Sequence, residues 1–345
     1  MASYDLTVRG AGIFGLSVAW VAAQRGARVQ VVDPNGPAAG SSGGIVGALA
    51  PHVPENWNAK KAFQLESLLM AEQFWTEVEA TGGGSAGYAR NGRLQPIADG
   101  PALALAQGRS ASAVALWADN AVWDVVEATG ADWEPNSSTG WLIHDTLSAL
   151  VHPRQGCAAL VKALAVKGVH VVGDAADQGA IIWATGVAGL EEMTQNHHRS
   201  IGNGVKGQAA LLQYDARGLP QLFAGGVHII PHHDGTVAIG STSERLYDSP
   251  DETDTQLDDV IAKARAAVPA LVHAPVIARW AGVRPRARSR APMLGAWPDR
   301  PGQFIANGGF KIGFGMAPKM AHVMADLILN GIDAIPPGFR VEDNL

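Results

Sequence analysis

Residues 5–33 decide the fold, and they read DLTVRGAGIFGLSVAWVAAQRGARVQVVD. A short apolar run leads into Gly10-Ala11-Gly12-Ile13-Phe14-Gly15, which is a G-x-G-x-x-G pattern. A helical pattern follows, and then a second apolar strand that ends in Asp33. This order of strand, glycine turn, helix, strand and acid is typical of a βαβ unit that binds a dinucleotide.

The glycines of this unit each have a physical reason. Gly10 allows the tight turn, Gly12 lets the backbone approach a pyrophosphate, and Gly15 lets the helix pack closely on the strand. The N-terminus of the helix offers N–H groups and partial positive charge to phosphates. Asp33 follows Gly15 by 18 residues, close to the roughly 20 expected for a carboxylate that binds a ribose hydroxyl.

The composition describes an ordinary globular protein. The chain has 345 residues, 47% hydrophobic and 17% charged, which predicts two domains or one large one. A net charge of −6 gives no sign of a nucleic-acid-binding surface. The single cysteine, Cys157, excludes an internal disulfide and is expected to be a small buried residue. The sequence shows no basic-apolar leader and no run of about 18 apolar residues, so we expect a cytoplasmic protein without a membrane span.

Hydrophobic periodicity outlines the remaining elements. It predicts helices over residues 59–81, 101–117, 120–129, 155–166, 253–267 and 317–330. Pro318 stands near the expected start of the last helix, and Gly331 lies just past its end. Strands are expected over residues 141–143, 169–172, 180–183, 278–283 and 302–306. Residues 88–97 read as a hairpin that turns at Asn91-Gly92, and residues 204–246 read as a β-meander.

Two further stretches belong to the neighbourhood of the glycine turn. Residues 40–44 read GSSGG, and Ser41 and Ser42 can cap a helix or donate to a phosphate. The alternative for this stretch is a flexible surface loop. Arg9 is unusual at the end of a buried strand, so we expect its stem to pack while its head reaches solvent or a phosphate.

Six motifs occur in an order that resembles the D-amino-acid oxidase family of flavoproteins, nearest to its glycine oxidase and sarcosine oxidase branches. The motifs are GAGIFG with Asp33, GSSGG, Ala184-Thr185-Gly186, IIPHHDGTVAIGSTSE, WAGVRPRARSRAPMLG and NGGFKIGFGMAP. The resemblance covers nearly the whole chain. It implies an FAD-dependent oxidoreductase, and it favours FAD over NAD.

The resemblance also implies a fold. It is α/β with an α+β second domain: a Rossmann-like FAD-binding domain over residues 1–80, 148–203 and 277–345, and a discontinuous substrate domain on an antiparallel sheet over residues 81–147 and 204–276. The residues expected to contact FAD are Gly10, Gly12, Ile13, Phe14, Gly15, Asp33, Pro34, Ser41, Ser42, Gly43, Gly44, Val172, Ala184, Thr185, Gly186, Gly282, Arg284, Gly308, Gly309, Phe310, Lys311 and Ile312.

The chain departs from the family pattern in several places. Asp33 stands where the family usually has glutamate, and aspartate can still accept from a ribose. The turn reads Asn307-Gly308-Gly309 where many relatives have Gly-His-Gly, and the stretch between Val172 and Ile181 is short. No cysteine lies in residues 284–311, where covalently flavinylated relatives carry one, and this implies non-covalent FAD.

Two cations are the main candidates for binding substrate. An amino-acid carboxylate calls for arginine, because a guanidinium binds it with two parallel hydrogen bonds. Arg284, in AGVRP, matches the family's carboxylate-binding arginine; the alternative is a structural ion pair. Lys311 resembles the basic residue that relatives place at the substrate carboxylate beside the flavin, where it can also promote the reaction with oxygen. The alternative for Lys311 is a surface lysine.

The histidines give weaker signals. His228 stands where relatives often carry a tyrosine that lines the substrate, and a satisfied strand histidine is the alternative. His52 closes GALAPH and is a candidate to approach the flavin ring. The pairs 197–198 and 232–233 are expected to be solvated loop residues without a third ligand at metal-binding spacing, so no metal site is predicted.

These residues leave several functions open. The first is oxidation of a small α-amino or N-methyl amino acid with oxygen as acceptor. The second is the same oxidation by a dehydrogenase that passes electrons to a quinone or carrier protein. The third is modification of a wobble-uridine carboxymethylaminomethyl group in tRNA, against which the net charge of −6 argues. The fourth is a non-catalytic FAD-binding module.

Overall fold

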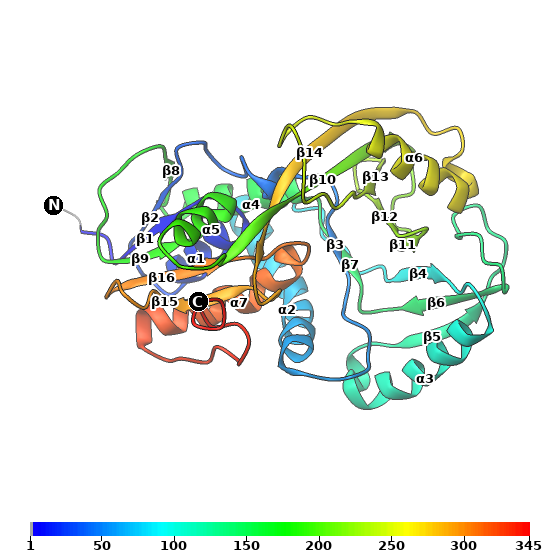
Figure 1. The fold of residues 1–345 in the computed structure, drawn as a ribbon, viewed down its shortest axis with the longest axis horizontal. Helices are drawn as coiled ribbons and strands as arrows, with labels where there is room; N and C mark the ends of the chain where they lie inside the picture. The colour runs from blue at the N-terminus through cyan, green and yellow to red at the C-terminus, as the bar shows by residue number, and fades with distance from the viewer. Residues whose placement is uncertain (1–2) are drawn as a thin grey trace.

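The computed structural model describes residues 3–345, and two large sheets dominate it (Figure 1). The first has six strands in the order β15 (Met293–Ala296), β16 (Gln303–Asn307), β9 (Ala180–Trp183), β1 (Leu6–Arg9), β2 (Val29–Val32) and β8 (Val171–Val172). Its strands pair in parallel except for β15 with β16. Apart from β15, this is the open parallel sheet that is typical of the βαβ pattern in residues 5–33.

The second sheet has eight strands. Their order is β14 (Val276–Ala287), β10 (Gly202–Gln213), β13 (Thr236–Gly240), β12 (Val227–Pro231), β11 (Gln221–Ala224), β4 (Arg93–Pro96), β6 (Trp141–Asp145) and β5 (Trp123–Glu127). The sheet is antiparallel apart from the pair of β4 with β11. A two-stranded sheet pairs β3 (Ala48–Leu49) with β7 (Ala149–Leu150).

The fold class predicted from the sequence is confirmed. The domain boundaries stay a prediction.

Seven helices surround the sheets among the described residues 3–345. They are α1 (Ile13–Gln24), α2 (Ala59–Gly82), α3 (Gly100–Leu116), α4 (Pro153–Val166), α5 (Gly186–Gln195), α6 (Thr255–Ala267) and α7 (Gly313–Asn330), with short 3-10 helices η1 (Ser41–Gly43), η2 (Ala118–Asn120) and η3 (Pro269–Leu271). In this part of the chain, no helix is long and apolar enough to cross a membrane.

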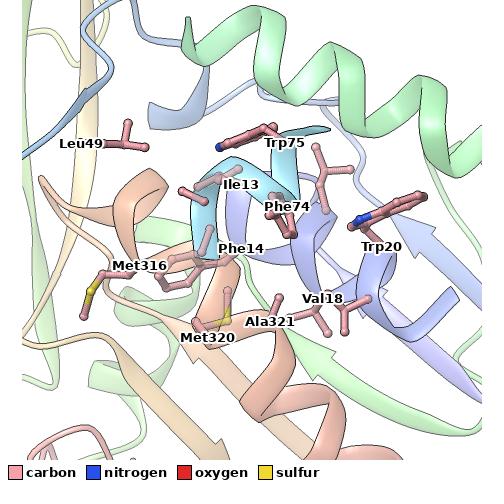
Figure 2. Packing of buried hydrophobic residues seen from close by; sticks show 14 of the residues in the cluster. Ile13, Phe14, Val18, Trp20, Leu49, Phe74, Trp75, Met316, Met320 and Ala321 are labelled. Carbon is pink, nitrogen blue, oxygen red and sulfur yellow. The ribbon is translucent and has the colours of Figure 1, made fainter. Parts of the chain in front are cut away.

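The core beside the parallel sheet is built where α1, α2 and α7 meet. Residues 13–22 of α1 are all buried, as expected for a helix that is apolar on every side. Figure 2 shows Phe14 and Val18 of α1 beside Met320 of α7 and Phe74 of α2. This packing fixes the N-terminus of α1, which is the end that carries the glycine turn.

Three predictions about elements are wrong. Residues 88–97 form no hairpin: only β4 forms there, and its partners β6 and β11 lie far along the chain. Residues 120–129 are not helical, because β5 pairs with β6 and buries Trp123 against Trp117, with ring centroids 5.9 Å apart. α7 begins at Gly313 rather than residue 317, so Pro318 lies inside it; the glycines of its first turn hid the start, because glycine is a poor helix former.

The strands of the predicted meander differ in one respect. β11, β12 and β13 follow one another as neighbours, whereas β10 pairs with β13 and β14 instead of β11. β10 and β14 have 12 residues each and run together across the molecule, from the second sheet toward the first (Figure 1). They therefore bring residues of the second sheet next to the glycine turn.

Candidate active site

One cavity of about 990 Å³ extends from the parallel sheet to the second sheet. It opens at the carboxyl ends of β1, β9 and β2, where Gly10, Ala184 and Asp33 line it. Ligands of open parallel sheets bind at this edge. The volume lies at the upper end of the roughly 300–1,000 Å³ that small-molecule sites occupy.

The glycine turn is packed as its sequence predicts. Gly10 has φ +105°, and a methyl group there would lie 2.4 Å from the carbonyl oxygen of Ala184. A methyl group at Gly15 would lie 1.9 Å from the carbonyl oxygen of Gly10, so α1 rests directly on the turn. At Gly12 a methyl group would meet only the Ser42 side chain, 3.1 Å from its Oγ. Gly10 and Gly15 are thus needed for packing, and Gly12 for space on the cavity side.

Polar groups converge on the same turn. Asp33 accepts hydrogen bonds from the backbone N–H groups of Ala11, at 2.8 Å, and Asn35, at 2.9 Å. A carboxylate has about four acceptor positions, so Asp33 can still accept from a ribose hydroxyl. Ser42 Oγ accepts from the backbone N–H of Ile13 at 3.0 Å, which holds η1 against the N-terminus of α1. These residues fit the pyrophosphate and ribose of FAD.

Most residues predicted to contact FAD line the cavity. They are Gly10, Gly12, Ile13, Phe14, Asp33, Pro34, Ser41, Ser42, Gly44, Ala184, Thr185, Gly186, Arg284, Gly308, Gly309, Phe310, Lys311 and Ile312. The cavity lining does not include Gly15, Gly43, Val172 or Gly282. These four support the wall from behind: Val172, for example, accepts from the Asp33 backbone N–H at 2.9 Å.

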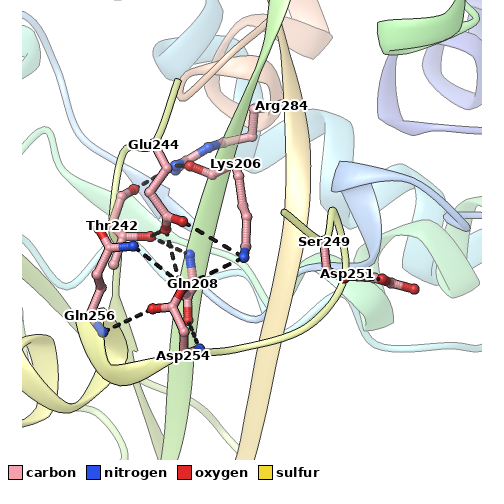
Figure 3. A network of polar contacts seen from close by, with 9 residues as sticks. All are labelled: Lys206, Gln208, Thr242, Glu244, Ser249, Asp251, Asp254, Gln256 and Arg284. Carbon is pink, nitrogen blue, oxygen red and sulfur yellow. Dashed lines mark hydrogen bonds and ion pairs between the residues drawn. The ribbon is translucent and has the colours of Figure 1, made fainter. Parts of the chain in front are cut away.

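Arg284 reaches the cavity from β14 and is anchored from behind (Figure 3). Its Nη1 donates to Ser241 Oγ at 2.7 Å, and its Nη2 donates to the carbonyl oxygens of Thr242, at 2.7 Å, and Lys206, at 3.2 Å. Its Nε has no partner among residues 3–345. Burial lowers the pKa of Arg284 to about 10, and Glu244 opposes this fall. The guanidinium is therefore held in place, keeps its charge at neutral pH and retains donors for a ligand.

The network behind Arg284 is buried and polar. Glu244 accepts from Gln208 Nε2 at 3.0 Å and from the Thr242 hydroxyl. Lys206 Nζ lies 3.7 Å from the Glu244 carboxylate and 3.9 Å from that of Asp254 (Figure 3). Lys206 thus lies within salt-bridge distance of Glu244, whereas Arg284 has no salt bridge in the described part of the chain.

Lys311 lies on the turn between β16 and α7. This turn contains Phe310, whose φ of +45° is unusual for an aromatic residue. Lys311 Nζ lies 5.6 Å from the centroid of the Phe310 ring, and Arg284 Cζ lies 5.7 Å from it. Burial of the ammonium lowers the pKa of Lys311, although the residue as a whole is exposed, and the charges of Arg284 and Arg286 lower it further. Arg286 Cζ lies 5.6 Å from the same centroid, so three cations that have no salt bridge within residues 3–345 face this ring.

The predicted histidines separate into different places. His228 of β12 lines the cavity with its ring centroid 4.7 Å from that of Phe223. Burial, with smaller contributions from Arg93 and Lys311, lowers the pKa of His228 to about 4, so the ring is neutral at pH 7. His52 does not line the cavity; its ring and its backbone N–H both contact Gln64.

His232 and Arg9 both have protein partners rather than solvent around their polar ends. His232 is not a solvated loop residue, because only 1% of it is exposed; that prediction is wrong. Its neighbour His233 is exposed as expected. The Arg9 head forms a salt bridge with Asp177, at 2.7 Å, while the residue also lines the cavity.

Sequence reasoning missed several residues of the site. Ser241 anchors Arg284, and Phe223, Trp280 and Ala209 line the cavity beside it. Asn307 lines it too, and its amide donates to the Gly186 carbonyl at 2.8 Å, which joins two of the recognised motifs. The pairing of β10 with β14 places Ala209 opposite Trp280, and the pairing of β10 with β13 places Ala209 opposite Gly240, the neighbour of Ser241; no local pattern in the sequence predicts these registers.

Comparison with known proteins matches residues 5–327 to the family described as FAD dependent oxidoreductase, DAO. Glycine oxidase from Pseudomonas aeruginosa is 33% identical over 134 residues, which are 39% of this chain and 37% of that protein. The bifunctional protein ThiO/ThiG from Trichormus variabilis is 24% identical over 94% of this chain and 52% of its own length. The chain therefore spans only about a third to a half of these relatives.

Other relatives match from end to end. Glycine oxidase from Bacillus licheniformis is 24% identical over 94% of this chain and 93% of its own length. The crystal structure of glycine oxidase from Geobacillus kaustophilus has a TM-score of 0.84 at 19% identity and covers 98% of both chains. Iminodiacetate oxidase from Chelativorans sp. has a TM-score of 0.84 at 20% identity and covers 97% of this chain and 98% of its own. At these identities the two solved structures establish the fold.

Proposed function

The chain belongs to the DAO family of FAD dependent oxidoreductases, and we propose that it oxidises the C–N bond of a small amino acid, or of an N-substituted glycine-like amine, to an imine. Molecular oxygen is the proposed acceptor, and the FAD is proposed to be non-covalent. One observation carries the proposal. Arg284 and Lys311 line the same cavity as the glycine turn, and each lacks a salt bridge within residues 3–345.

These two cations fit a substrate carboxylate. Burying a charge without an opposite charge is costly, so the half-buried Arg284, which has no salt bridge within residues 3–345, is suited to an anionic ligand. Arg284 holds its guanidinium by three hydrogen bonds and can offer its remaining donors without reorganising. Lys311 adds a second positive charge across the Phe310 ring. Together they would hold the carboxylate and so orient the α-carbon.

The other groups of the site agree with an amine substrate. When bound, FAD supplies the redox chemistry by accepting a hydride from carbon. Neutral His228 adds no positive charge to the cavity wall, so it does not repel an amine. The rings of Phe223 and Trp280 contribute apolar lining. The cavity lining thus combines the cations Arg284 and Lys311 with a neutral imidazole and apolar rings.

The names of the relatives support a small substrate. Several are glycine oxidases, and one structural relative is an iminodiacetate oxidase. Glycine and iminodiacetate both carry a carboxylate one carbon from the nitrogen. A substrate of that kind needs only the anchoring that Arg284 and Lys311 offer. The non-covalent cofactor is supported by Cys157, the single cysteine, which is 1% exposed and does not line the cavity.

A substrate screen tests this function. Small amino acids and N-substituted glycines are supplied to the purified yellow protein in air, and hydrogen peroxide is measured. Turnover with peroxide supports the oxidase. If substrate reduces the flavin but no peroxide forms, and an added quinone reoxidises the flavin, the protein is a dehydrogenase instead. Acid precipitation should release the FAD, and flavin that stays with the pellet would contradict non-covalent binding.

A further inference from the structure

A cluster of three potential metal ligands lies outside the cavity lining. His152 precedes the first residue of α4, while His232 and Asp234 lie in the turn between β12 and β13. One ligand atom from each lies within 4.8 Å of those from the other two. The centroids of the two imidazole rings are 4.4 Å apart. The sequence predicted no metal here because the third ligand comes from a distant segment.

The hydrogen bonds around His232 leave one nitrogen without a partner. The Thr236 hydroxyl donates to Asp234 Oδ1 at 2.6 Å, so its oxygen can only accept from the ring. His232 Nδ1 lies 3.2 Å from that oxygen and must therefore carry the proton. The lone pair is then on Nε2, which is buried and has no hydrogen-bond partner among residues 3–345. An unpaired buried acceptor is costly, and a bound cation would satisfy it.

The other two residues can complete such a site. Nδ1 of His152 accepts one long hydrogen bond, 3.5 Å from the Gln155 backbone N–H, so binding an ion through either ring nitrogen costs only this weak bond. Asp234 Oδ1 accepts from the backbone N–H and the hydroxyl of Thr236, and Oδ2 has no such bond within residues 3–345 and can bind an ion. His232 is only 1% exposed, and the form with its single proton on Nδ1 is neutral. Neutral imidazole is the form that binds metals.

We propose that His152, His232 and Asp234 bind one divalent transition-metal ion of the Zn²⁺ type. Two imidazoles and a carboxylate suit this class, whereas Ca²⁺ and Mg²⁺ prefer oxygen ligands throughout. Water would complete the coordination. The hydrogen bond from His232 Nδ1 to the Thr236 hydroxyl is of the kind that orients metal-binding histidines through their second nitrogen.

The ion would have a structural role. It would tie the N-terminus of α4 to the turn between β12 and β13, two segments that lie in different parts of the fold. α4 also carries Arg154, whose Nε donates to the Gly43 carbonyl at 2.7 Å, and Pro153, which lines the cavity. Metal binding is therefore expected to raise the melting temperature of the FAD-loaded protein.

Zinc titration of the tag-free, EDTA-stripped holoprotein tests the proposal. Isothermal titration calorimetry with ZnCl₂ should show one equivalent bound by the wild type. His232→Gln should abolish this binding and Asp234→Asn should weaken it at least about ten-fold, while His233→Gln, at the exposed neighbour, should leave it unchanged. Thr236→Val should weaken zinc binding about 10- to 100-fold, because it removes the hydroxyl that accepts from His232 and donates to Asp234, two of the proposed ligands.

Differential scanning calorimetry with and without Zn²⁺ gives a second readout. Zinc should raise the melting temperature of the wild type and of His233→Gln, but not of His232→Gln. If His232→Gln fails to fold, Asp234→Asn decides, because that side chain is exposed and the variant keeps Oδ1. Absence of stoichiometric binding by the wild type, or equal binding by the wild type and Asp234→Asn, would overturn the proposal.

Discussion

Arg284 combines two tasks in one side chain. Its Nη2 donates to the carbonyl oxygens of Lys206 and Thr242 and its Nη1 to Ser241, and the residue also lines the cavity. We expect Arg284→Ala to lower kcat/KM for an amino acid by about 30- to several thousand-fold, because truncating one partner of a buried charge pair costs about 2–5 kcal/mol. Steady-state kinetics measure this, and Arg284→Lys should recover only part, since lysine lacks the planar fork.

A carboxylate-free amine is the control for Arg284. Its turnover should fall much less than that of the amino acid. Because the side chain also anchors two backbone carbonyls, the FAD content and melting temperature of each variant need to be measured alongside. Equal losses for both substrates would mean that Arg284 supports the fold or the flavin rather than the carboxylate.

Lys311 allows a separate test at the same scale. If it binds the carboxylate, Lys311→Met should slow anaerobic reduction of the flavin by substrate and raise the substrate Kd, while reoxidation by oxygen stays normal. Stopped-flow measurement of the two half-reactions separates these effects. Slower reoxidation alone would assign Lys311 to the oxygen reaction, and changes below about 0.5 kcal/mol in both would make it a surface lysine.

The pH dependence of Lys311 follows from its lowered pKa. The charged form binds a carboxylate, and burial together with Arg284 and Arg286 moves the loss of that charge below the ordinary lysine value of 10.5. The kcat/KM of the wild type should therefore fall on the alkaline side as the ammonium deprotonates. Lys311→Met should lack this part of the profile.

At the scale of elements, β10 and β14 build the substrate end of the site. The guanidinium of Arg284 lies over Gly207 of β10, where a methyl group would be 2.1 Å from Nη2 and 2.4 Å from Cζ. Gly207→Ala should therefore displace the guanidinium and lower kcat/KM by about 100-fold, the scale of a 1 Å misplacement. Gly108→Ala in α3, with no atom within 4 Å of the new methyl group, is the matched control. Unchanged kinetics in Gly207→Ala would contradict this placement.

The turn between β1 and α1 builds the cofactor end. Gly15→Ala should reduce the melting temperature, because its methyl group meets the Gly10 carbonyl and overpacking costs about 1–3 kcal/mol. Gly12→Val should instead leave a folded protein that no longer retains FAD, because only the Ser42 side chain faces it from within the protein. FAD titration and thermal unfolding distinguish the two variants. Wild-type FAD affinity in Gly12→Val would remove Gly12 from the pyrophosphate site.

At the scale of the whole molecule, local patterns predicted the parts whose contacts are local. The glycine turn, α1 and the strands β1 and β2 follow one another directly, and the structure agrees there. The helix expected over residues 59–81 is also found, as α2 over Ala59–Gly82, and its ends are fixed locally by the Asn58 side chain, which accepts from the Lys61 N–H, and by Gly83 in the left-handed region. Each of these features needs no distant partner.

The elements that were predicted wrongly depend on partners that are distant in the sequence. β5 was predicted as helix because its partner β6 lies beyond a loop, and β4 was predicted as half of a hairpin although its partners are distant. At the site, Ser241 and Trp280 reach Arg284 only through the pairing of β10 with β13 and β14. His152 and His232 likewise come from segments that lie far apart in the sequence, before α4 and after β12. Burial and register of such residues depend on the whole fold, which local periodicity does not encode.

The proposed oxidation depends most on a substrate carboxylate that is held at Arg284 and Lys311 beside FAD. Anaerobic bleaching of the flavin absorbance by glycine, by N-methylglycine and by methylamine tests this directly, because methylamine is glycine without its carboxylate. At least one of the two amino acids should bleach the flavin at concentrations where methylamine does not. Equal bleaching by glycine and methylamine, or no bleaching by any small amino acid across a wider screen, would contradict a carboxylate site at Arg284 and Lys311.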